Sequence, residues 1–284
     1  MPKGLALNIG LNSVNPDHYQ GWSGPLNACE ADALDMAGIG RSCGFKAKVL
    51  LTRKATRNAV LKALRDAAIK LRPGDIFLLS YSGHGGQLPD LNSDEETDAQ
   101  DETWCLYNGE LVDDEIFQAL AKFAKGVRIL VFSDSCHSGT VTKDLYYAAK
   151  TNHREARDAP PVSQGALPIR YRAMPPQVAL RTYRANKTEY DKILKSIKAD
   201  VMKDVKASVL LISGCQDNQL SADGDFNGLF TANLLRVWNE GQFKGSYKKF
   251  HRNIVKAMPP DQTPNFYIVG MTHKTFERQK PFTV

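Results

Sequence analysis

Residues 127–139, VRILVFSDSCHSG, join an apolar run to a turn with reactive side chains. The first six residues are apolar apart from one arginine, which is typical of a strand buried on both faces of a parallel sheet. Asp134, Cys136 and His137 follow at its end. Because ligands bind outside the carboxyl ends of the strands in open parallel sheets, this turn is a candidate functional site.

Two further apolar runs end in the same way. Residues 75–86, DIFLLSYSGHGG, place His84 after a strand, and residues 208–219, SVLLISGCQDNQ, place Cys215 and Asp217 after another. Parallel strands would bring these ends to one edge of the sheet. We therefore expect His84 to face Cys136, and Cys215 and Asp217 to line the substrate cleft.

His84, rather than His137, is the expected partner of Cys136. Sequence neighbours on a tight turn usually point apart, so His137 is poorly placed to reach the Cys136 sulfur. A histidine on the next strand end can reach it. Glycines on both sides of His84 would let the backbone approach a substrate closely.

The whole chain alternates predicted strands with predicted helices. This order predicts an α/β fold in three layers, with a mainly parallel central sheet of about six strands and helices on both faces. The predicted strands cover residues 5–11, 48–51, 76–81, 127–132, 208–212 and 266–269. The predicted helices cover residues 28–44, 56–71, 113–125, 190–204, 228–241 and 247–258.

Composition indicates a cytoplasmic, globular protein. The chain has 284 residues, of which 42% are hydrophobic, and no run of about 18 apolar residues that could cross a membrane. We find no signal peptide in the sequence. Five scattered cysteines, with no Cys-x-x-Cys pair, fit neither a disulfide framework nor a structural zinc site. We expect Cys29, Cys43 and Cys105 to pack in the core, and we expect a monomer.

A basic segment interrupts the alternation. Residues 143–206 hold 14 Lys and Arg against 7 Asp and Glu, whereas the rest of the chain has a net charge of −1. Residues 145–188 include five prolines and show no clear period, which favours an irregular linker. The positive charge is compatible with a solvated connector or with a nucleic-acid-binding surface. The segment has no regularly spaced aromatic residues, which weakens the second interpretation.

The motifs YSGHGG and DSCHSG resemble the histidine and cysteine motifs of the metacaspases, a group of caspase-like cysteine peptidases, here of the bacterial type I-like (orthocaspase-like) kind. LNACEADA, LVDDE and SGCQDNQLSAD resemble further segments of that family in the same order. The resemblance spans most of residues 4–270. It implies one caspase-like domain over residues 1–284, with the linker 145–188 between a large part (1–145) and a small part (188–284).

The resemblance also implies site residues for a thiol protease. Cys136 would be the nucleophile, His84 the general acid that protonates the departing amine, and the N–H groups of Gly85 and Cys136 the donors to the oxyanion. Asp32, Asp134 and Ser82 would form the S1 pocket. Two carboxylates there suit Arg or Lys in a protein or peptide substrate, and the chemistry requires no cofactor. Asp134 stands where animal caspases have Gln, which argues against cleavage after Asp.

Regulation by calcium is a second implication of the resemblance. Some metacaspases need calcium, and Asp101, Asp113, Asp114 and Asp144 are the matching positions in this chain. Residues 90–102 form an acidic stretch, DLNSDEETDAQDE, that does not have the EF-hand pattern. A soluble acidic loop is the alternative reading of that stretch.

Processing in the linker is the last expectation. The prolines of the linker disfavour regular structure, so we expect its backbone to be exposed. The linker also holds several arginines: Arg154, Arg157, Arg170, Arg172, Arg181 and Arg184. We expect a zymogen that is cut after an Arg or Lys within residues 150–187, by itself or by another protease. The alternative function is a catalytically weak scaffold that binds protein or nucleic-acid partners through the basic segment.

Overall fold

The computed structural model of the chain describes residues 1–89, 100–135, 171–198, 200–214, 223–224, 226–260, 262–271 and 273–284. Several predicted site residues therefore lie outside the described residues: Cys136, Asp144, Cys215 and Asp217. Most of the acidic stretch and most of the linker also lie outside them.

A six-stranded sheet forms the middle layer, in the order β2-β1-β3-β7-β8-β9. All neighbouring pairs are parallel except β8 and β9. The six strands are β1 (Gly4–Gly10), β2 (Phe45–Leu51), β3 (Ile76–Ser82), β7 (Arg128–Asp134), β8 (Ser208–Ser213) and β9 (Asn265–Gly270). Each predicted strand is present, and the prediction of a mainly parallel six-stranded sheet is confirmed.

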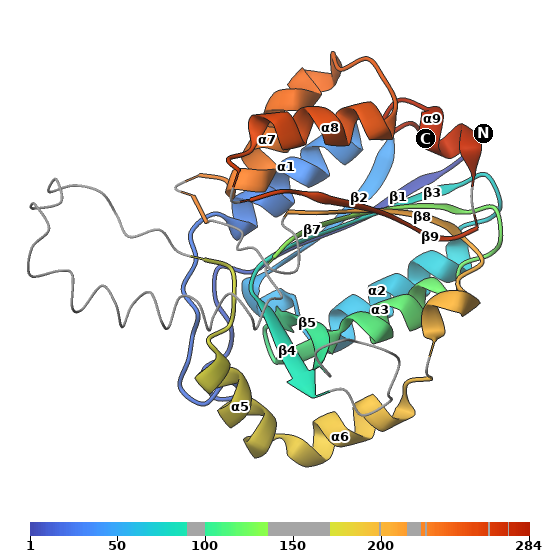
Figure 1. Cartoon of the computed structure of the whole chain (residues 1–284). Coiled ribbons are helices and arrows are strands. Elements are labelled where there is room, and N and C mark those ends of the chain that lie inside the picture. Colours follow the sequence, from blue (N-terminus) through green and yellow to red (C-terminus); the bar gives the residue numbers. More distant parts are fainter. Residues whose placement is uncertain are drawn as a thin grey trace, which may run out of the picture.

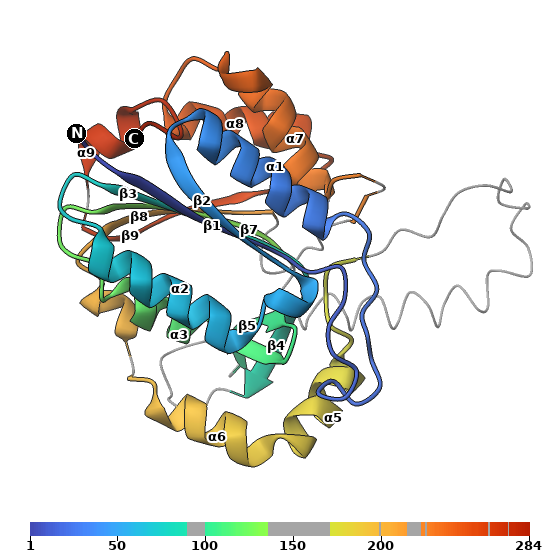
Figure 2. The same ribbon diagram turned by 180° about the vertical axis from the view of Figure 1, so that it is seen from behind.

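Helices cover both faces of this sheet (Figures 1 and 2). One face carries α1 (Cys29–Ser42), α7 (Leu229–Trp238) and α8 (Tyr247–Ala257), and the other carries α2 (Arg57–Lys70) and α3 (Asp113–Leu120). Short helical pieces are η1 (Thr52–Lys54), η2 (Val201–Asp204), η3 (Asn239–Gly241) and α9 (Lys274–Arg278). The predicted three-layer arrangement is confirmed.

Strand side chains explain why both faces are covered. On β7, Ile129 and Val131 pack into the core on the α2 side, whereas Leu130 and Phe132 pack into the core on the α1 side. Successive side chains of a strand point to opposite faces, so a continuous apolar run needs a layer on each side.

A second, smaller sheet was not predicted. It contains β4 (Gly85–Pro89), β5 (Gln100–Leu106) and β6 (Gly109–Val112), all antiparallel. The sequence of β4, GGQLP, has two glycines and a proline, residues that are depleted in strands. The local propensity of these residues therefore argues against a strand, but pairing with β5 makes β4 a strand nevertheless.

The expectation of irregular structure throughout residues 145–188 is wrong at its C-terminal end. Residues Pro176–Ala185 form α5, and α6 follows at Lys187–Ser196. A proline is tolerated in the first turn of a helix, because the N–H that it lacks has no intrahelical partner there. The prolines at 175 and 176 therefore mark the start of a helix.

None of the helices in the described ranges has both the length and the apolar character that a membrane crossing requires.

Candidate active site

The ends of β3 and β7 lie side by side at one edge of the central sheet. These strands are parallel, and Ser82 at the end of β3 pairs with Asp134 at the end of β7. His84 follows β3 by two residues, and Cys136 follows β7 by two residues. The register thus brings Ser82 and Asp134, the last residues of the two strands, to the same level of the sheet edge.

His84 is held in one orientation by its surroundings. Its side chain is buried, its Nε2 atom lies 3.0 Å from the carbonyl oxygen of Gly24, and its ring packs 4.7 Å from the ring of Trp22. Gly24 has a φ of +50°, and a Cβ there would lie 2.8 Å from Nε2 and 2.7 Å from the Trp22 ring. Only glycine fits this position without displacing the catalytic candidate.

The electrostatics of His84 favour a neutral ring. Burial lowers the pKa of His84 to about 4, and the hydrogen bond to Gly24 only partly opposes this effect. Since a carbonyl oxygen can only accept, Nε2 carries the proton and Nδ1 keeps its lone pair. Nδ1 is buried and has no hydrogen-bond partner among the residues that the structure describes. It can accept a proton.

Arg172 is fully buried beside this edge. Its guanidinium lies 2.8 Å from the carboxylate of Asp32, 2.9 Å from that of Asp134 and 3.0 Å from that of Asp223. It also donates to the hydroxyl of Ser82 at 2.7 Å. These four groups come from α1, the end of β7, the segment before α7 and the end of β3, so the fold builds one acidic pocket from distant parts of the chain.

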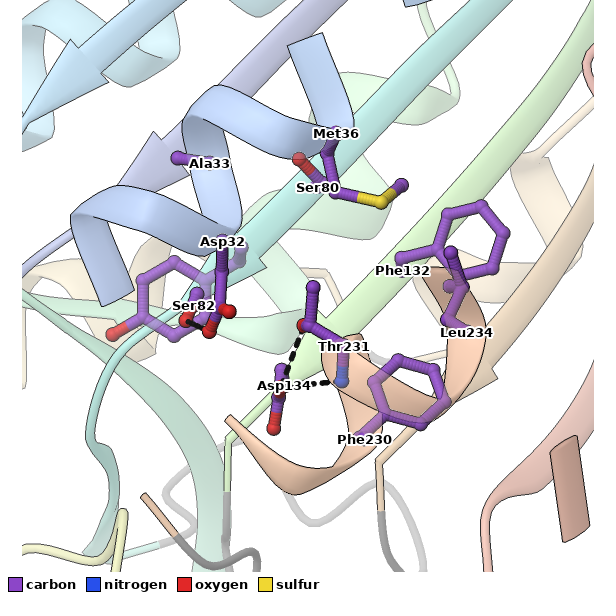
Figure 3. A pocket seen from close by; sticks show the side chains of 11 residues that line it. Asp32, Ala33, Met36, Ser80, Ser82, Phe132, Asp134, Phe230, Thr231 and Leu234 are labelled. Carbon is purple, nitrogen blue, oxygen red and sulfur yellow. Dashed lines mark hydrogen bonds between the residues drawn. The ribbon is translucent and has the colours of Figure 1, made fainter. Parts of the chain in front are cut away.

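Polar groups hold the carboxylates of Asp134 and Asp32 in place. Asp134 accepts hydrogen bonds from the Thr231 hydroxyl at 2.8 Å and from the Thr231 N–H at 3.3 Å, as Figure 3 shows. Asp32 accepts from Ser82 at 2.7 Å and from the N–H of Gly228 at 3.0 Å. A Cβ at Gly228 would overlap the guanidinium of Arg172. The wall of the pocket therefore requires glycine at that position.

Burial and charge act against each other in this pocket. Burial raises the pKa of Asp32, although the Arg172 guanidinium lowers it. The carboxylates in turn keep the pKa of Arg172 well above its ordinary value, despite burial. A buried cation is thus stabilised only because several carboxylates surround it.

A cavity of about 10 Å³ lies beside Asp32 and Asp134, between α1, β3, β7 and α7 (Figure 3). That volume admits no more than one water molecule.

The backbone of Arg172 is also fixed. Its carbonyl oxygen accepts a hydrogen bond of 2.9 Å from the N–H of Gly85, and the Gly85 carbonyl accepts one of 2.7 Å from the N–H of Met174. This pairs Ala173 with Gly85 as a short parallel bridge. The carbonyl of the peptide bond between Arg172 and Ala173 thus accepts a hydrogen bond from the N–H of Gly85, which was predicted to stabilise an oxyanion.

The structure brings together Asp32, Ser82, Asp134, His84 and Gly85, all of which the sequence singled out. Asp223 was missed, although the quoted segment SGCQDNQLSAD ends with it. The signal for Asp223 is that it is a second carboxylate after Asp217 in the segment that follows β8. Arg172 was one of six arginines in the linker, and no local pattern set it apart.

The three cysteines in the described residues are poor nucleophiles. Cys29 and Cys105 are buried, and burial raises the pKa of Cys29 to about 12 and that of Cys105 well above its usual range. Both were expected to pack in the core, and this is confirmed. Cys43 is half-buried against the core on the α1 side, and burial also raises its pKa.

The predicted calcium ligands in the described part of the chain do not make a metal site by themselves. Asp101 is buried in β5, and Asp113 and Asp114 begin α3. Across the described ranges, no group of three or more His, Cys, Asp or Glu side chains is arranged to hold a metal ion. Asp144 lies outside those ranges, so calcium binding stays a prediction.

Comparisons with known proteins show the family of this chain. The family described as "Caspase domain" matches residues 3–276. Metacaspase-1 of Schizosaccharomyces pombe is 30% identical over 259 residues, which cover 84% of this chain and 59% of that protein. Metacaspase-1 of Saccharomyces cerevisiae (strain S288c) is 30% identical over 263 residues, which cover 82% and 57%. The chain thus spans little more than half the length of these relatives.

Two solved structures are also similar. Protein GSU0716 from Geobacter sulfurreducens is 58% identical, with a TM-score of 0.88 over 100% of this chain and 99% of that chain. Caspase-1 from Spodoptera frugiperda has a TM-score of 0.54 over 95% of this chain and 87% of that chain, at 12% identity, and shows the fold alone. With the family match over residues 3–276, the chain belongs to the caspase-domain family of cysteine peptidases.

Proposed function

We propose that this peptidase cleaves peptide bonds after basic residues and prefers arginine. The observation that supports the proposal is the buried Arg172 guanidinium among three carboxylates and a hydroxyl. A pocket with this charge would repel an aspartate side chain. Arginine suits it better than lysine, because the planar guanidinium can donate to several acceptors at once.

The proposed chemistry uses Cys136 and His84. Nδ1 of the neutral His84 ring takes the thiol proton, and the Cys136 thiolate attacks the carbonyl carbon after the arginine. The developing oxyanion is stabilised by the N–H of Gly85, and by that of Cys136. His84 then gives the proton to the departing amine as the C–N bond breaks, and water hydrolyses the thioester.

We further propose that the chain is a zymogen and that Arg172 marks its processing site. The support is that Arg172 makes both contacts expected of the residue before a scissile bond: its side chain pairs with the carboxylates of the acidic pocket, and its carbonyl oxygen accepts a hydrogen bond from the N–H of Gly85. While it stays there, no other arginine can enter. A cut between Arg172 and Ala173 would allow the pocket to empty. The position lies within the predicted window of residues 150–187.

Processing at Arg172 can be checked by intact mass. Incubated wild-type protein is expected to give residues 1–172 and 173–284, and Cys136→Ala is expected to stay uncut. Arg172→Gln should also stay uncut at this bond, because a neutral amide cannot pair with the carboxylates. Arg181→Gln, a change on the exposed side of α5, is the matched control and should be cut like the wild type.

Arg172→Lys tests whether loss of cutting reflects recognition rather than misfolding. It keeps the buried positive charge but loses the planar fork, so we expect cutting to slow by about tenfold. An active, folded wild type that is cut at other bonds, with the bond after Arg172 intact, would contradict the assignment.

Calcium stimulation is a separate proposal, and it rests on the family resemblance and the acidic stretch before β5. Millimolar calcium is expected to raise the rate of peptide hydrolysis severalfold, and Asp113→Asn with Asp114→Asn is expected to remove the effect. The measurement is the initial rate with calcium and in excess chelator. Equal rates in the two conditions would rule out the stimulation.

We also propose that the protein acts in the cytoplasm, as a monomer, on protein or peptide substrates. The free thiols at Cys29, Cys43 and Cys105 support a reducing compartment.

A further inference from the structure

We propose that residues 173–198 stay bound after the cut at Arg172 and block the subsites for substrate residues that follow the scissile bond. We call these residues the primed-side segment. The inference rests on the proposed function, since it needs the cut. It makes the cut enzyme its own partial inhibitor.

The first support is the position of Met174, two residues after the proposed cut. Its side chain is buried and packs with Val14, Tyr19 and Cys105. Its N–H donates to the carbonyl of Gly85. A substrate that extends past the scissile bond would need the Gly85 carbonyl as its own hydrogen-bond acceptor. Met174 therefore occupies both a backbone position and a side-chain position that such a substrate would use.

The second support is the packing of the helices behind Met174. Val178 on α5 belongs to the same apolar cluster as Met174. Tyr190 and Leu194 on α6 are buried against Leu88 of β4 and Val112 of β6. In Figures 1 and 2, α5 and α6 lie beside the small sheet. Burial of several apolar side chains would keep the segment in place without the peptide bond to Arg172.

The third support is a pair of hydrogen bonds at Tyr190. Its hydroxyl accepts from the N–H of Glu110 at 3.0 Å and lies 2.8 Å from Nε2 of His18. Burial lowers the pKa of His18, so the neutral ring can accept the Tyr190 proton. The side chain of Asn186 also donates to the His18 carbonyl at 3.3 Å. Tyr190 therefore fixes the primed-side segment to the body of the enzyme.

The two sides of the proposed cut differ in their attachment. Upstream, among the described residues, the contacts with the pocket come from the single residue Arg172. Downstream, Met174, α5 and α6 contact two apolar clusters of the enzyme body instead, one around Tyr19 and one around Leu88. Because the primed-side segment has contacts of its own, we expect it to stay bound when the cut lets Arg172 leave the pocket.

A bound segment competes with substrates that extend past the scissile bond. Its effect is to raise the apparent KM by the reciprocal of the fraction of open molecules, with kcat unchanged. A substrate that ends just after the arginine, such as a blocked arginine methyl ester, would not compete. The ratio of KM values for the two substrates measures the block.

The experiment uses protein cut after Arg172, as shown by its mass. Met174→Asp and Tyr190→Phe are compared with wild type on a peptide that has residues on both sides of arginine, and on a blocked arginine methyl ester. Tyr183→Phe is the control, because the Tyr183 hydroxyl bonds Asp191 within the segment. We expect KM for the peptide to fall about tenfold in the first two variants, with kcat and the ester kinetics unchanged.

Hydrogen exchange gives the second readout. Residues 173–198 should stay protected in the cut wild type and lose protection in Tyr190→Phe. Loss of that protection on cutting the wild type, or an unchanged KM ratio in both variants, would overturn the inference. Absence of the cut after Arg172, or of ester hydrolysis by the wild type, would instead overturn the proposed function, and the inference with it.

Discussion

His84→Ala is expected to lower kcat/KM for arginyl peptides by about a thousandfold or more. The reason is that general acid–base catalysis contributes about 10²- to 10⁴-fold, and in the proposed mechanism His84 moves the proton in both halves of the acylation step. Its Nε2 is fixed by Gly24 and its Nδ1 carries the lone pair. The measurement is steady-state hydrolysis of a fluorogenic arginyl peptide.

His137→Ala is the matched comparison, since it removes the histidine next to Cys136 in the sequence. It should keep most of the activity. Cys136→Ala should have none, and circular dichroism of all three variants should match the wild type. If His137→Ala is as inactive as His84→Ala while folded, the choice of the base is wrong.

Asp134→Asn is expected to lower kcat/KM for arginyl peptides by about a hundredfold, and to slow the cut after Arg172 to a similar extent. Asp134 lies 2.9 Å from the Arg172 guanidinium and is held by Thr231. Removing one partner of a buried, hydrogen-bonded ion pair costs about 2–5 kcal/mol, which corresponds to this loss. The amide keeps the shape of the side chain, so the effect would come from the charge.

Asp35→Asn is the control for the second prediction. Asp35 accepts a hydrogen bond from Asn227, a neighbour of the pocket, but no hydrogen bond or ion pair to Arg172 is found for it among the described residues. The variant should behave like the wild type. If Asp134→Asn kept the wild-type preference for arginine over glutamine before the scissile bond, the acidic pocket would not determine specificity.

Much of the fold could be predicted, because strong local signals agree with the tertiary arrangement. The apolar strand that ends at Asp134 needs packed side chains on both faces, and helices supply them on both faces in the structure. The small sheet could not be predicted, since the glycines and proline of β4 argue against a strand and only its pairing with β5 makes it one. Tertiary pairing overrides local propensity there.

The candidate site divides in the same way. His84, Asp32 and Asp134 stand in recognisable motifs. Arg172 does not, because its role depends on a chain path that returns the linker to the sheet edge. Asp223 is similar: its carboxylate becomes part of the pocket only when the segment before α7 folds over the start of α1.

The three carboxylates of the pocket lie on separate elements, and this bears on how easily evolution or engineering could change the specificity. The carboxylate of Asp223 also accepts hydrogen bonds from the N–H groups of Asn27 and Ala28, just before α1, at N–O distances of 2.8 and 3.4 Å. Asp32 likewise accepts the N–H of Gly228 at the start of α7. A mutation that altered either carboxylate would disturb a helix end as well as the pocket. The proposed preference for arginine is therefore tied to the integrity of the scaffold, and single substitutions should more often produce an unstable enzyme than one with a new preference.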